Sequence, residues 1–346
     1  MKDLKTLDFN EINEIIKNIK EPAYRAGQLY KWLHIKHVLS FDEMNNIPLD
    51  LKQKLSKDYY ISGLKEVLFK ESPIDGTRKY LFKLDDNNII ESVFMRYKHG
   101  NSVCISSQVG CKMGCTFCAS TLGGLVRNLT NAEMLAQVYA ITESVGERIS
   151  NIVIMGAGEP MDNYENVVSF VKMISDEQGV NISRRNITIS TCGIVPQMKR
   201  LADDKLAVTL ALSLHAPDNE TRKKLMPIAR AYNIDEVLAA CDYYFKKTGR
   251  RVSFEYALVA GVNDSSKEAQ KLIKLIKHSK AHVNLIPVNP IEERSYRQSD
   301  KKRVEAFKNQ LLKAGINATI RREMGRDIDG ACGQLRRHYE AENSEI

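Results

Sequence analysis

Three cysteines lie within a stretch of eight residues, at Cys111, Cys115 and Cys118. A loop this short can direct three thiols towards one inorganic centre. A zinc site or an electron-transfer iron–sulfur cluster usually takes four protein ligands, whereas three thiols would leave one iron of a 4Fe-4S cluster open to another molecule. The spacing therefore predicts a 4Fe-4S cluster with an open position. The alternatives are a zinc site with a distant fourth ligand, or three ordinary thiols.

The overall charge favours a polyanionic partner such as a nucleic acid. The chain of 346 residues carries 51 Lys and Arg against 43 Asp and Glu, which gives a formal net charge of +8. Basic clusters scattered through a folded chain are typical of patches that contact phosphates, although each cluster alone could be a solvated surface. These clusters are Arg184 with Arg185, Arg250 with Arg251, Lys301 with Lys302 and Arg303, Arg321 with Arg322, and Arg336 with Arg337.

The sequence also bears on where the protein acts. Its first residues lead into polar sequence without the apolar segment of a signal peptide, and no run is long enough to cross a bilayer. Seven cysteines, three of them clustered, do not resemble the disulfide framework of a secreted protein. We therefore expect a cytoplasmic protein without membrane association, and a monomer as the default oligomeric state.

The N-terminal part of the chain is expected to be helical, followed by a β-hairpin. Apolar residues recur at helical spacing over 11–19 and 24–33, and a short helix is expected over 49–55. Runs rich in β-branched and aromatic residues at 79–84 and 89–95 flank an Asp-Asp-Asn-Asn sequence, which predicts a turn between two strands.

Beyond residue 100, strands and helices are expected to alternate. Repeated strand–helix units produce a parallel sheet, either doubly wound or curled towards a barrel. The expected strands are 103–106, 152–155, 187–190, 208–214, 252–259, 283–288 and 318–320, and the expected helices are 131–144, 163–174, 234–245, 266–276 and 301–312.

Polar motifs follow several of these strands. The carboxyl ends of parallel strands meet at one edge of a sheet, so we expect the motifs to form one site. Glycine at a strand end is weak evidence alone, because turns also favour it. The motifs are the cysteine loop after the first strand, Gly158 and Glu159 after the second, Ser190 at the third, Ser213, Leu214 and His215 at the fourth, and Asn289 after a later one.

The cysteine loop together with Gly-Glu-Pro at 158–160 resembles the radical S-adenosylmethionine (SAM) enzymes. Longer sequence motifs narrow the resemblance to the bacterial family that methylates C2 of adenosine in 23S ribosomal RNA and transfer RNA. This resemblance covers nearly the whole chain. A related family methylates C8 of the same ribosomal adenosine, but 158–160 and 321–324 are more similar to the C2 enzymes. The narrowing strings are those at 104–111, 213–217, 225–228 and 321–335.

The resemblance implies an α/β fold, namely a partial (β/α)6 radical-SAM barrel with an N-terminal helical accessory domain and a small β extension. Residues 1–58 would form the helical domain and contact RNA. Residues 59–98 would form the β-hairpin extension. Residues 99–346 would form the radical-SAM core, which ends in a loop with a methyl-carrying cysteine.

The resemblance also implies the cofactors. Cys111, Cys115 and Cys118 would hold a 4Fe-4S cluster whose open iron chelates the amine and carboxylate of SAM. Two SAM molecules would be used per turnover, and an electron donor such as flavodoxin or ferredoxin would supply the reducing electron. The residues implied to form the SAM pocket are Gly158, Glu159, Ser190, Ser213, Leu214, His215 and Asn289.

In the implied mechanism, Cys332 carries the methyl group. One SAM would methylate the Cys332 thiolate, and a radical derived from the second SAM would take a hydrogen from that methyl group. The carbon radical would add to C2 of an adenosine, in the peptidyl transferase region of 23S rRNA or next to the tRNA anticodon, and join enzyme to RNA. Proton loss and attack by Cys104 on the Cys332 sulfur would release the product and leave a transient disulfide.

Three further residues are interpreted individually, and for Glu91 two interpretations compete. Glu91 lies in an expected strand, where alternation favours a solvent-facing side chain, but the resemblance points to it as a proton acceptor. Cys192 and Cys241 are interpreted as inert, small hydrophobic residues.

Two functions besides RNA methylation stay open at this stage. One is a radical enzyme with the same cofactors that acts on a protein or a small molecule. The other is a non-enzymatic iron–sulfur protein that binds RNA or senses redox state. Salt-dependent RNA binding would argue against the former, and SAM cleavage would exclude the latter.

Overall fold

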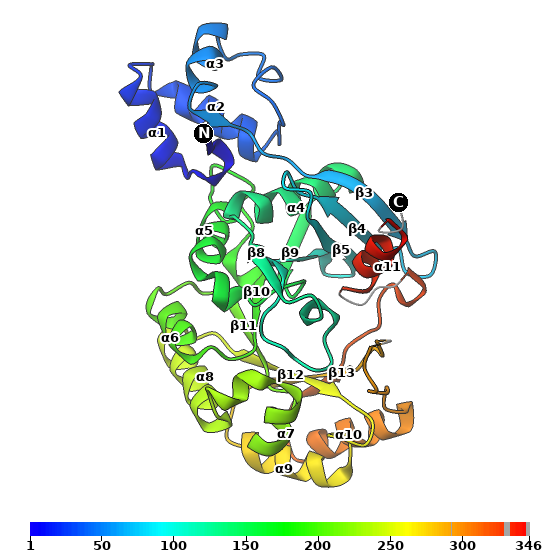
Figure 1. The fold of residues 1–346 in the computed structure, drawn as a ribbon. Coiled ribbons are helices and arrows are strands. Elements are labelled where there is room, and N and C mark those ends of the chain that lie inside the picture. The colour runs from blue at the N-terminus through cyan, green and yellow to red at the C-terminus, as the bar shows by residue number, and fades with distance from the viewer. Residues whose placement is uncertain (292, 329–332, 344–346) are drawn as a thin grey trace.

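The structure is a computed structural model that describes residues 1–291, 293–328 and 333–343 (Figure 1). Within these residues the main element is a ten-stranded sheet in the order β14-β13-β12-β11-β10-β9-β6-β5-β4-β3. Neighbouring strands are parallel from β6 to β14 and antiparallel from β3 to β6. The parallel strands are β6 (Gly100–Ile105), β9 (Ile149–Ile154), β10 (Ile187–Thr191), β11 (Thr209–Ser213), β12 (Val252–Leu258), β13 (His282–Pro287) and β14 (Ala318–Ile320).

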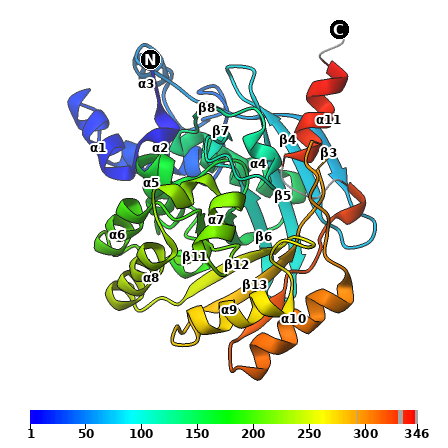
Figure 2. The same ribbon diagram turned by 60° about the horizontal axis from the view of Figure 1, so that its bottom comes forward.

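Helices cover the outer face of this sheet (Figures 1 and 2). Their apolar sides pack on outward-facing strand residues such as Ile152 and Leu210 and form the largest buried core. A shorter helix, α7 (Asn219–Leu225), lies in the connection between β11 and α8. The covering helices are α4 (Asn131–Val145), α5 (Tyr164–Ile174), α6 (Val195–Asp203), α8 (Ile234–Thr248), α9 (Ser266–Ile276) and α10 (Lys301–Lys313).

The inner face of the sheet is concave. Side chains from β5 through to β14 line one cavity of about 440 Å³. In the described part of the chain, β3 and β14 are the two edge strands, so the sheet curls around this hollow without closing. The predicted α/β fold with a partial barrel is therefore confirmed.

Local sequence fixes where the helices begin and end. Thr130 and Glu133 form a capping box at the start of α4, and Asn233 and Glu236 do the same for α8. The expected helix 266–276 and strand 318–320 match α9 and β14 residue for residue. The short helix α6, whose nine residues begin with a Val-Pro pair, was not predicted.

The predicted hairpin is present and is longer than expected. The strands β4 (Arg78–Lys83) and β5 (Ile89–Tyr97) pair as foreseen, and a third strand that the sequence pattern missed, β3 (Lys65–Glu71), pairs with β4. These three antiparallel strands, here called the β extension, continue the main sheet beyond β6.

The N-terminal helices pack around a core of their own (Figure 1). The structure contains α1 (Phe9–Asn18), α2 (Tyr24–His34) and α3 (Leu49–Leu55), close to the expected bounds. They contact the parallel part through α4, where Nδ1 of buried His34 lies 2.9 Å from the Tyr139 hydroxyl.

Smaller elements complete the described chain, and among its helices none combines the length and apolar character that would span a membrane. The C-terminal helix α11 (Gln334–Asn343) lies beside the β extension (Figures 1 and 2). The short strands are β1 (Lys2–Asp3), β2 (Tyr59–Tyr60), β7 (Gln108–Gly110) and β8 (Leu125–Asn128), and the 3-10 segments are η1 (Leu4–Thr6), η2 (Ala119–Thr121), η3 (Pro160–Asn163), η4 (Arg184–Asn186), η5 (Pro227–Arg230) and η6 (Arg326–Ile328).

Candidate active site

The cysteine loop is held at its base by the small hairpin of β7 and β8. The backbone N–H of Cys111 donates to the carbonyl of Gly124 at 2.8 Å. Gly110 has a φ of +75°, and a Cβ there would lie 2.0 Å from the carbonyl oxygen of Gly124. Only glycine allows the two arms to approach this closely, and the loop is thereby forced to turn between them.

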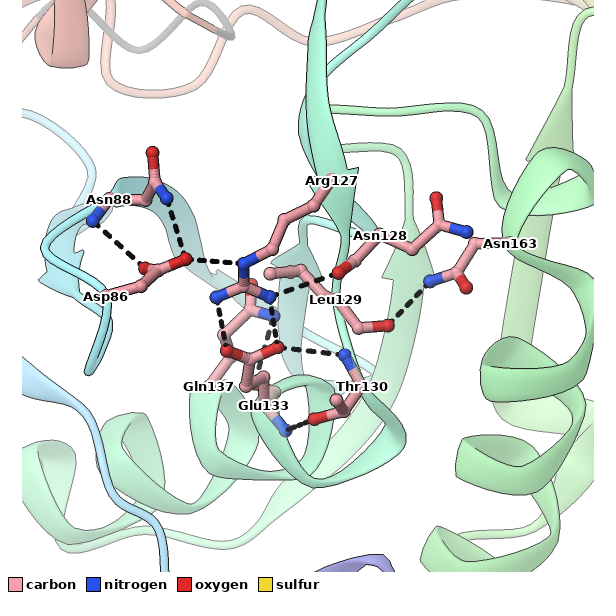
Figure 3. Close-up of polar contacts among 9 residues, drawn as sticks. All are labelled: Asp86, Asn88, Arg127, Asn128, Leu129, Thr130, Glu133, Gln137 and Asn163. Atoms are coloured by element: carbon pink, nitrogen blue, oxygen red, sulfur yellow. Dashed lines mark hydrogen bonds and ion pairs between the residues drawn. The ribbon is translucent and has the colours of Figure 1, made fainter.

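Arg127 joins this hairpin to the rest of the fold (Figure 3). From β8, its guanidinium donates to Asp86 in the β4–β5 turn at 2.5 Å and to the two carboxylate oxygens of Glu133 at 2.7 and 2.9 Å. Glu133 is also part of the capping box of α4. Because a bidentate Arg–carboxylate pair fixes direction as well as distance, the base of the cysteine loop is tied to α4 and to the β extension at once.

The structure brings the three loop cysteines together in an apolar environment. Burial raises the pKa of Cys111 to about 12 and also raises the pKa of Cys115, and the nearby Cys118 thiol contributes to both shifts. The thiols of Cys111 and Cys115 are therefore protonated at neutral pH until a metal replaces the protons. Three soft sulfur donors suit an iron–sulfur cluster.

A single metal ion fits these donors less well than a cluster does. Within the described residues, no three His, Cys, Asp or Glu side chains converge on one ion position. A cluster takes its thiolates on separate iron atoms, so its ligands need not meet at one point. The donor set around the loop is therefore compatible with the predicted 4Fe-4S cluster.

Gln108 connects the cysteine loop to the end of β9. Its amide donates to Asn128 at 2.7 Å and to Asp162 at 3.0 Å, and its carbonyl accepts from the N–H of Glu159 at 2.8 Å. Gly158 has a φ of +107°, and a Cβ there would lie 2.6 Å from the Cβ of Gln108. This approach requires glycine and places Gly158 and Glu159 beside the cysteine loop.

The Glu159 carboxylate joins the ends of two neighbouring strands. It is buried, and its two oxygens accept from the backbone N–H groups of Cys192 at 2.7 Å and Met161 at 3.0 Å. Burial raises the pKa of Glu159, and these hydrogen bonds oppose the rise. Cys192 is buried, as the sequence interpretation required, but it also takes part in this connection, whereas Cys241 lies buried in α8.

Arg222 of α7 organises the carboxyl ends of β10 and β11. The guanidinium is completely buried and donates to the carbonyl of Cys192 at 2.6 Å. It also donates to the carbonyls of Ser213, Leu214 and Tyr232, each at 3.3 Å. Burial lowers the pKa of Arg222, but an arginine remains charged at neutral pH. Arg222 therefore holds the main chain of two predicted pocket residues, Ser213 and Leu214.

His215 is a neutral, hydrogen-bonded histidine at the end of β11. Its Nδ1 accepts from the backbone N–H of Ala257 at 2.9 Å, so the proton of the neutral ring is on Nε2. Burial lowers the pKa of His215 to about 3. The ring packs edge to face with Phe117 of the cysteine loop, with ring centres 4.9 Å apart. This geometry supports pocket lining rather than proton transfer.

The remaining predicted pocket residues lie at the same edge of the sheet. Ser190 and Ser213 are half-buried on the inner sides of β10 and β11, and Leu214 is buried directly after β11. Asn289 follows β13 and is exposed. The cysteine loop leaves this same edge after β6, so the structure gathers the motifs as parallel-sheet topology requires.

Cys104 and Glu91 share the inner face on adjacent strands. Cys104 of β6 pairs with Val93 of β5, two residues from Glu91, so the side chains of Cys104 and Glu91 point to the same side. Cys104 is 5% exposed and Glu91 is 6% exposed. The interpretation of Glu91 as a solvent-facing residue is therefore wrong.

Cys332 lies outside the described residues, but its neighbour Gly333 is placed. The N–H of Gly333 donates to the Glu91 carboxylate at 2.6 Å. A Cβ on Gly333 would lie 3.0 Å from the Cβ of Ala119, the residue that follows Cys118. Gly333 thus contacts both the end of the cysteine loop and a carboxylate on the strand next to Cys104.

The cavity on the inner face lies next to Cys104. Met95 and Met155 line it and pack in one cluster with Cys104. Exposed Arg185, Arg321 and Arg322 also line it, so two of the predicted basic clusters converge on one opening. Every parallel strand adds a small polar side chain, namely Ser102, Asn151, Thr188, Thr209, Ser253, Asn284 and Thr319.

Sequence reasoning missed three residues that shape the site. Gln108 lies inside the string 104–111, where a polar residue just before the cysteine loop was a usable signal. Lys79 is completely buried with its Nζ 3.4 Å from the Glu91 carboxylate, and a lysine on the inward-facing side of an apolar strand was another signal. Arg222, in a highly charged helix of seven residues, resembles a solvated side chain in sequence.

Two family models match the chain. The model of the radical SAM superfamily matches residues 105–274, from the end of β6 into α9. The model described as the ribosomal RNA large subunit methyltransferase N-terminal domain matches residues 2–61, which contain α1, α2 and α3.

Curated relatives and a solved structure match almost the whole chain. A Lachnospira eligens protein named probable dual-specificity RNA methyltransferase RlmN is 58% identical over 339 residues, covering 98% of this chain and 97% of the relative. A Clostridium novyi protein of the same name is 54% identical over 339 residues, covering 98% and 99%. The crystal structure of a radical SAM methyltransferase from Sphaerobacter thermophilus has a TM-score of 0.92 and 41% identity, covering 96% of this chain and 99% of that one.

Proposed function

This chain belongs to the RlmN family of dual-specificity RNA methyltransferases, and we propose that it methylates C2 of adenosine in two RNAs. The substrates are an adenosine in the peptidyl transferase region of 23S rRNA and an adenosine next to the tRNA anticodon. The observation that carries the proposal is the position of Gly333, between Ala119 of the cysteine loop and Glu91 on the inner face.

That position supports a carrier role for Cys332, which directly precedes Gly333 in the sequence. Gly333 lies against Ala119, at the end of the loop with the three cysteines, and it donates to Glu91, on the strand that pairs with the strand of Cys104. A methyl carrier has to approach both the SAM site and the substrate.

The cofactors of this family are a 4Fe-4S cluster and SAM, with two SAM molecules per turnover. We assign the cluster to Cys111, Cys115 and Cys118. When bound, it supplies the electron for the reductive cleavage of SAM. The residues assigned to the SAM pocket are Gly158, Glu159, Ser190, Ser213, Leu214, His215 and Asn289. We assign contact with the methionine end of SAM to Gly158 and Glu159, whose carboxylate is held in place by two backbone N–H groups.

Carrier chemistry suits the target atom. C2 of adenine is an electron-poor ring carbon that does not attack the methyl group of SAM directly. The Cys332 thiolate instead attacks the methyl carbon of one SAM, the bond from that carbon to the sulfonium breaks, and S-adenosylhomocysteine leaves. The 5′-deoxyadenosyl radical from the second SAM would then take a hydrogen atom from the carrier methyl group, which would give 5′-deoxyadenosine and a carbon radical that can add to C2.

Release of the product falls to Glu91 and Cys104. After the carbon is bonded to C2, enzyme and RNA are joined through Cys332, Glu91 accepts the proton that C2 loses, and the unpaired electron of the adduct passes to the oxidised form of the electron donor. The Cys104 thiolate then attacks the Cys332 sulfur and breaks its bond to the transferred carbon, which takes up a proton to become the methyl group. A thiol reductant reopens the disulfide that is left. The shared inner face of Cys104 and Glu91 supports this division of roles.

The RNA would reach these residues through the cavity on the inner face. Its arginines suit the phosphates that flank a target nucleotide, and Met95 and Met155 connect it to Cys104. The N-terminal domain, residues 1–58, would add contacts to the RNA. We further propose a monomer that acts in the cytoplasm, where its RNA substrates are found, with flavodoxin or ferredoxin as the electron donor.

The test is mass spectrometry of RNA nucleosides after anaerobic incubation with reductant, SAM and protein-free 23S rRNA. The wild-type chain should produce 2-methyladenosine, Cys332→Ala should produce none, and Cys241→Ala serves as a control thiol. Formation of 8-methyladenosine would mean that the enzyme methylates C8 and not C2. Formation of 5′-deoxyadenosine without a methylated base would indicate another substrate, and absence of both would indicate a non-enzymatic iron–sulfur protein.

A further inference from the structure

We infer that the β extension is a clamp that holds both ends of the segment with Cys332, and that Glu91 and Lys79 are its positioning residues. The inference rests on the proposed carrier role of Cys332. The clamp consists of β3, β4, β5 and the turn between β3 and β4. The two segments that it holds are 325–328, on the N-terminal side of Cys332, and 333–336, on the C-terminal side.

The C-terminal side is fixed by the Glu91 carboxylate. One oxygen accepts from the N–H of Gly333 and the other from the N–H of Arg336, both at 2.6 Å. These N–H groups belong to the start of α11, where backbone donors have no partner within the helix. A carboxylate at this position also complements the positive end of the helix dipole. Glu91 therefore fixes the helix start that directly follows Cys332.

Lys79 completes this anchor from the neighbouring strand. Its Nζ lies 3.4 Å from the carboxylate of Glu91, and the Lys79 side chain is completely buried. Burying two charges is costly unless geometry and hydrogen bonds compensate for the lost hydration. Here the Glu91 carboxylate has donors on both oxygens, which explains how a charged pair is accommodated inside the fold.

An apolar contact strengthens the same anchor. Leu335 is 1% exposed and packs with Leu81 of β4 and Ile89 of β5. Leu81 pairs with Glu91 across the two strands, so these contacts lie on one face of the extension. The start of α11 is thus docked by both polar and apolar groups.

The N-terminal side is fixed by the turn between β3 and β4. The Ser72 hydroxyl donates to the Asp327 carboxylate at 2.7 Å, and the Asp75 carboxylate accepts from the N–H of Gly325 at 3.1 Å. Gly325 has a φ of +60°, and a Cβ there would lie 3.0 Å from the methyl carbon of Thr77. Both flanks of 329–332 therefore meet the same three-stranded extension.

The clamp gives Glu91 a role that precedes proton transfer. While Gly333 and Arg336 are docked, the carboxylate oxygens are occupied by donors. Methylation of Cys332 by SAM requires a correctly placed thiol but no proton acceptor for C2 and no RNA. A positioning role and a proton-acceptor role therefore affect different halves of the reaction.

The experiment measures Cys332 methylation in the reconstituted full chain without RNA, by mass spectrometry of the Cys332 peptide. Glu91→Gln leaves one of the two backbone N–H groups without an acceptor, and Asp75→Asn weakens the other anchor. We expect both to slow Cys332 methylation by about tenfold or more, since each loses a hydrogen bond to a charged group. Glu71→Gln is the matched control, because Glu71 adjoins Ser72 but its carboxylate accepts from Arg78 across the two strands.

Two further readouts separate positioning from general damage. Asp75→Asn should retain its iron content and its 5′-deoxyadenosine formation, since it leaves the cysteine loop and the SAM pocket intact. Hydrogen exchange of the peptide that begins at Gly333 should become faster in Glu91→Gln and stay unchanged in Glu71→Gln.

Normal Cys332 methylation in both anchor variants, with an enzyme–RNA adduct that accumulates in Glu91→Gln, would overturn the clamp and leave Glu91 as a proton acceptor alone. A wild-type chain that never methylates Cys332 would overturn the proposed function and this inference with it.

Discussion

The guanidinium of Arg222 donates a 2.6 Å hydrogen bond to the backbone carbonyl of Cys192, at the end of the neighbouring strand β10. Together with its bonds to Ser213 and Leu214, this contact places one buried cation behind two strand ends of the proposed SAM pocket. The proposed pocket is therefore shaped by a buried side chain that holds the main chain at the ends of two strands.

Replacing Arg222 with Met should destabilise the chain by about 3 kcal/mol or more, because several buried carbonyl groups lose their donor. The loss should appear in urea unfolding of the reconstituted protein and as weaker SAM binding. Arg230→Met is the control, since Arg230 is exposed on the nearby segment η5. Equal stability of the two variants would contradict the role given to Arg222.

Gly158 tests whether the end of β9 must contact the cysteine loop. Gly158→Ala would bring a Cβ to 2.6 Å from that of Gln108, at a φ of +107° that disfavours any side chain. We expect a loss of about 1–3 kcal/mol in stability and a lower affinity for SAM, measured by equilibrium dialysis. Gly123→Ala should be tolerated, because a Cβ there meets nothing within 4 Å.

Cys104 should be needed after the methyl carbon is bonded to RNA. In Cys104→Ala the carrier sulfur cannot be attacked, so the enzyme–RNA adduct should accumulate as a slow-migrating band on a denaturing gel. The band should disappear after digestion with ribonuclease. Cys192→Ala should not trap RNA. An adduct-free Cys104→Ala variant that produces 2-methyladenosine at the normal rate would exclude Cys104 as the resolving thiol.

The alternation of strands and helices could be read from the sequence because it depends on local periodicity. The expected ranges 266–276 and 318–320 are reproduced as α9 and β14. The cysteine loop and the strand-end motifs could be grouped for a similar reason, since parallel topology brings the carboxyl ends of strands to one edge.

Contacts between distant segments could not be read in this way. Glu91 has the expected position in its strand, yet its partner Gly333 lies 242 residues further along the chain. No periodicity indicates that pairing, so burial of Glu91 in place of the expected solvent exposure follows from tertiary structure alone. The cavity arginines are a similar case, because Arg185 and Arg322 line one cavity only when the sheet curls.

His34 should make the chain sensitive to acid. Burial is the largest cause that lowers the pKa of His34 to about 3, whereas an unfolded histidine titrates near 6.5. Below pH 6.5 the His34 imidazole binds a proton in the unfolded chain but stays neutral in the folded chain. The stability from this group is therefore complete above pH 6.5 and is lost as the pH falls towards 3.

Between pH 6.5 and pH 5 this proton uptake by the unfolded chain lowers the free energy of unfolding by about 2 kcal/mol. Urea unfolding at pH 7 and pH 5 should therefore show a smaller difference in His34→Gln than in the wild type. His278→Gln, which changes an exposed histidine after α9, should keep the wild-type difference. An unchanged difference in His34→Gln would mean that His34 does not set the acid response.

The arginines of the inner cavity should bind RNA phosphates. If Arg185 and Arg322 each neutralise one phosphate, then Arg185→Gln and Arg322→Gln should each reduce the slope of log Kd against log salt by about 0.7–1. The slope is measured by titrating a labelled 23S rRNA fragment at several KCl concentrations. Lys274→Gln provides the matched loss of charge, on the exposed side of α9 and away from the cavity lining. Equal slopes for all three variants would place the RNA on another surface, whereas a selective change in the two arginine variants would locate its entry beside Cys104.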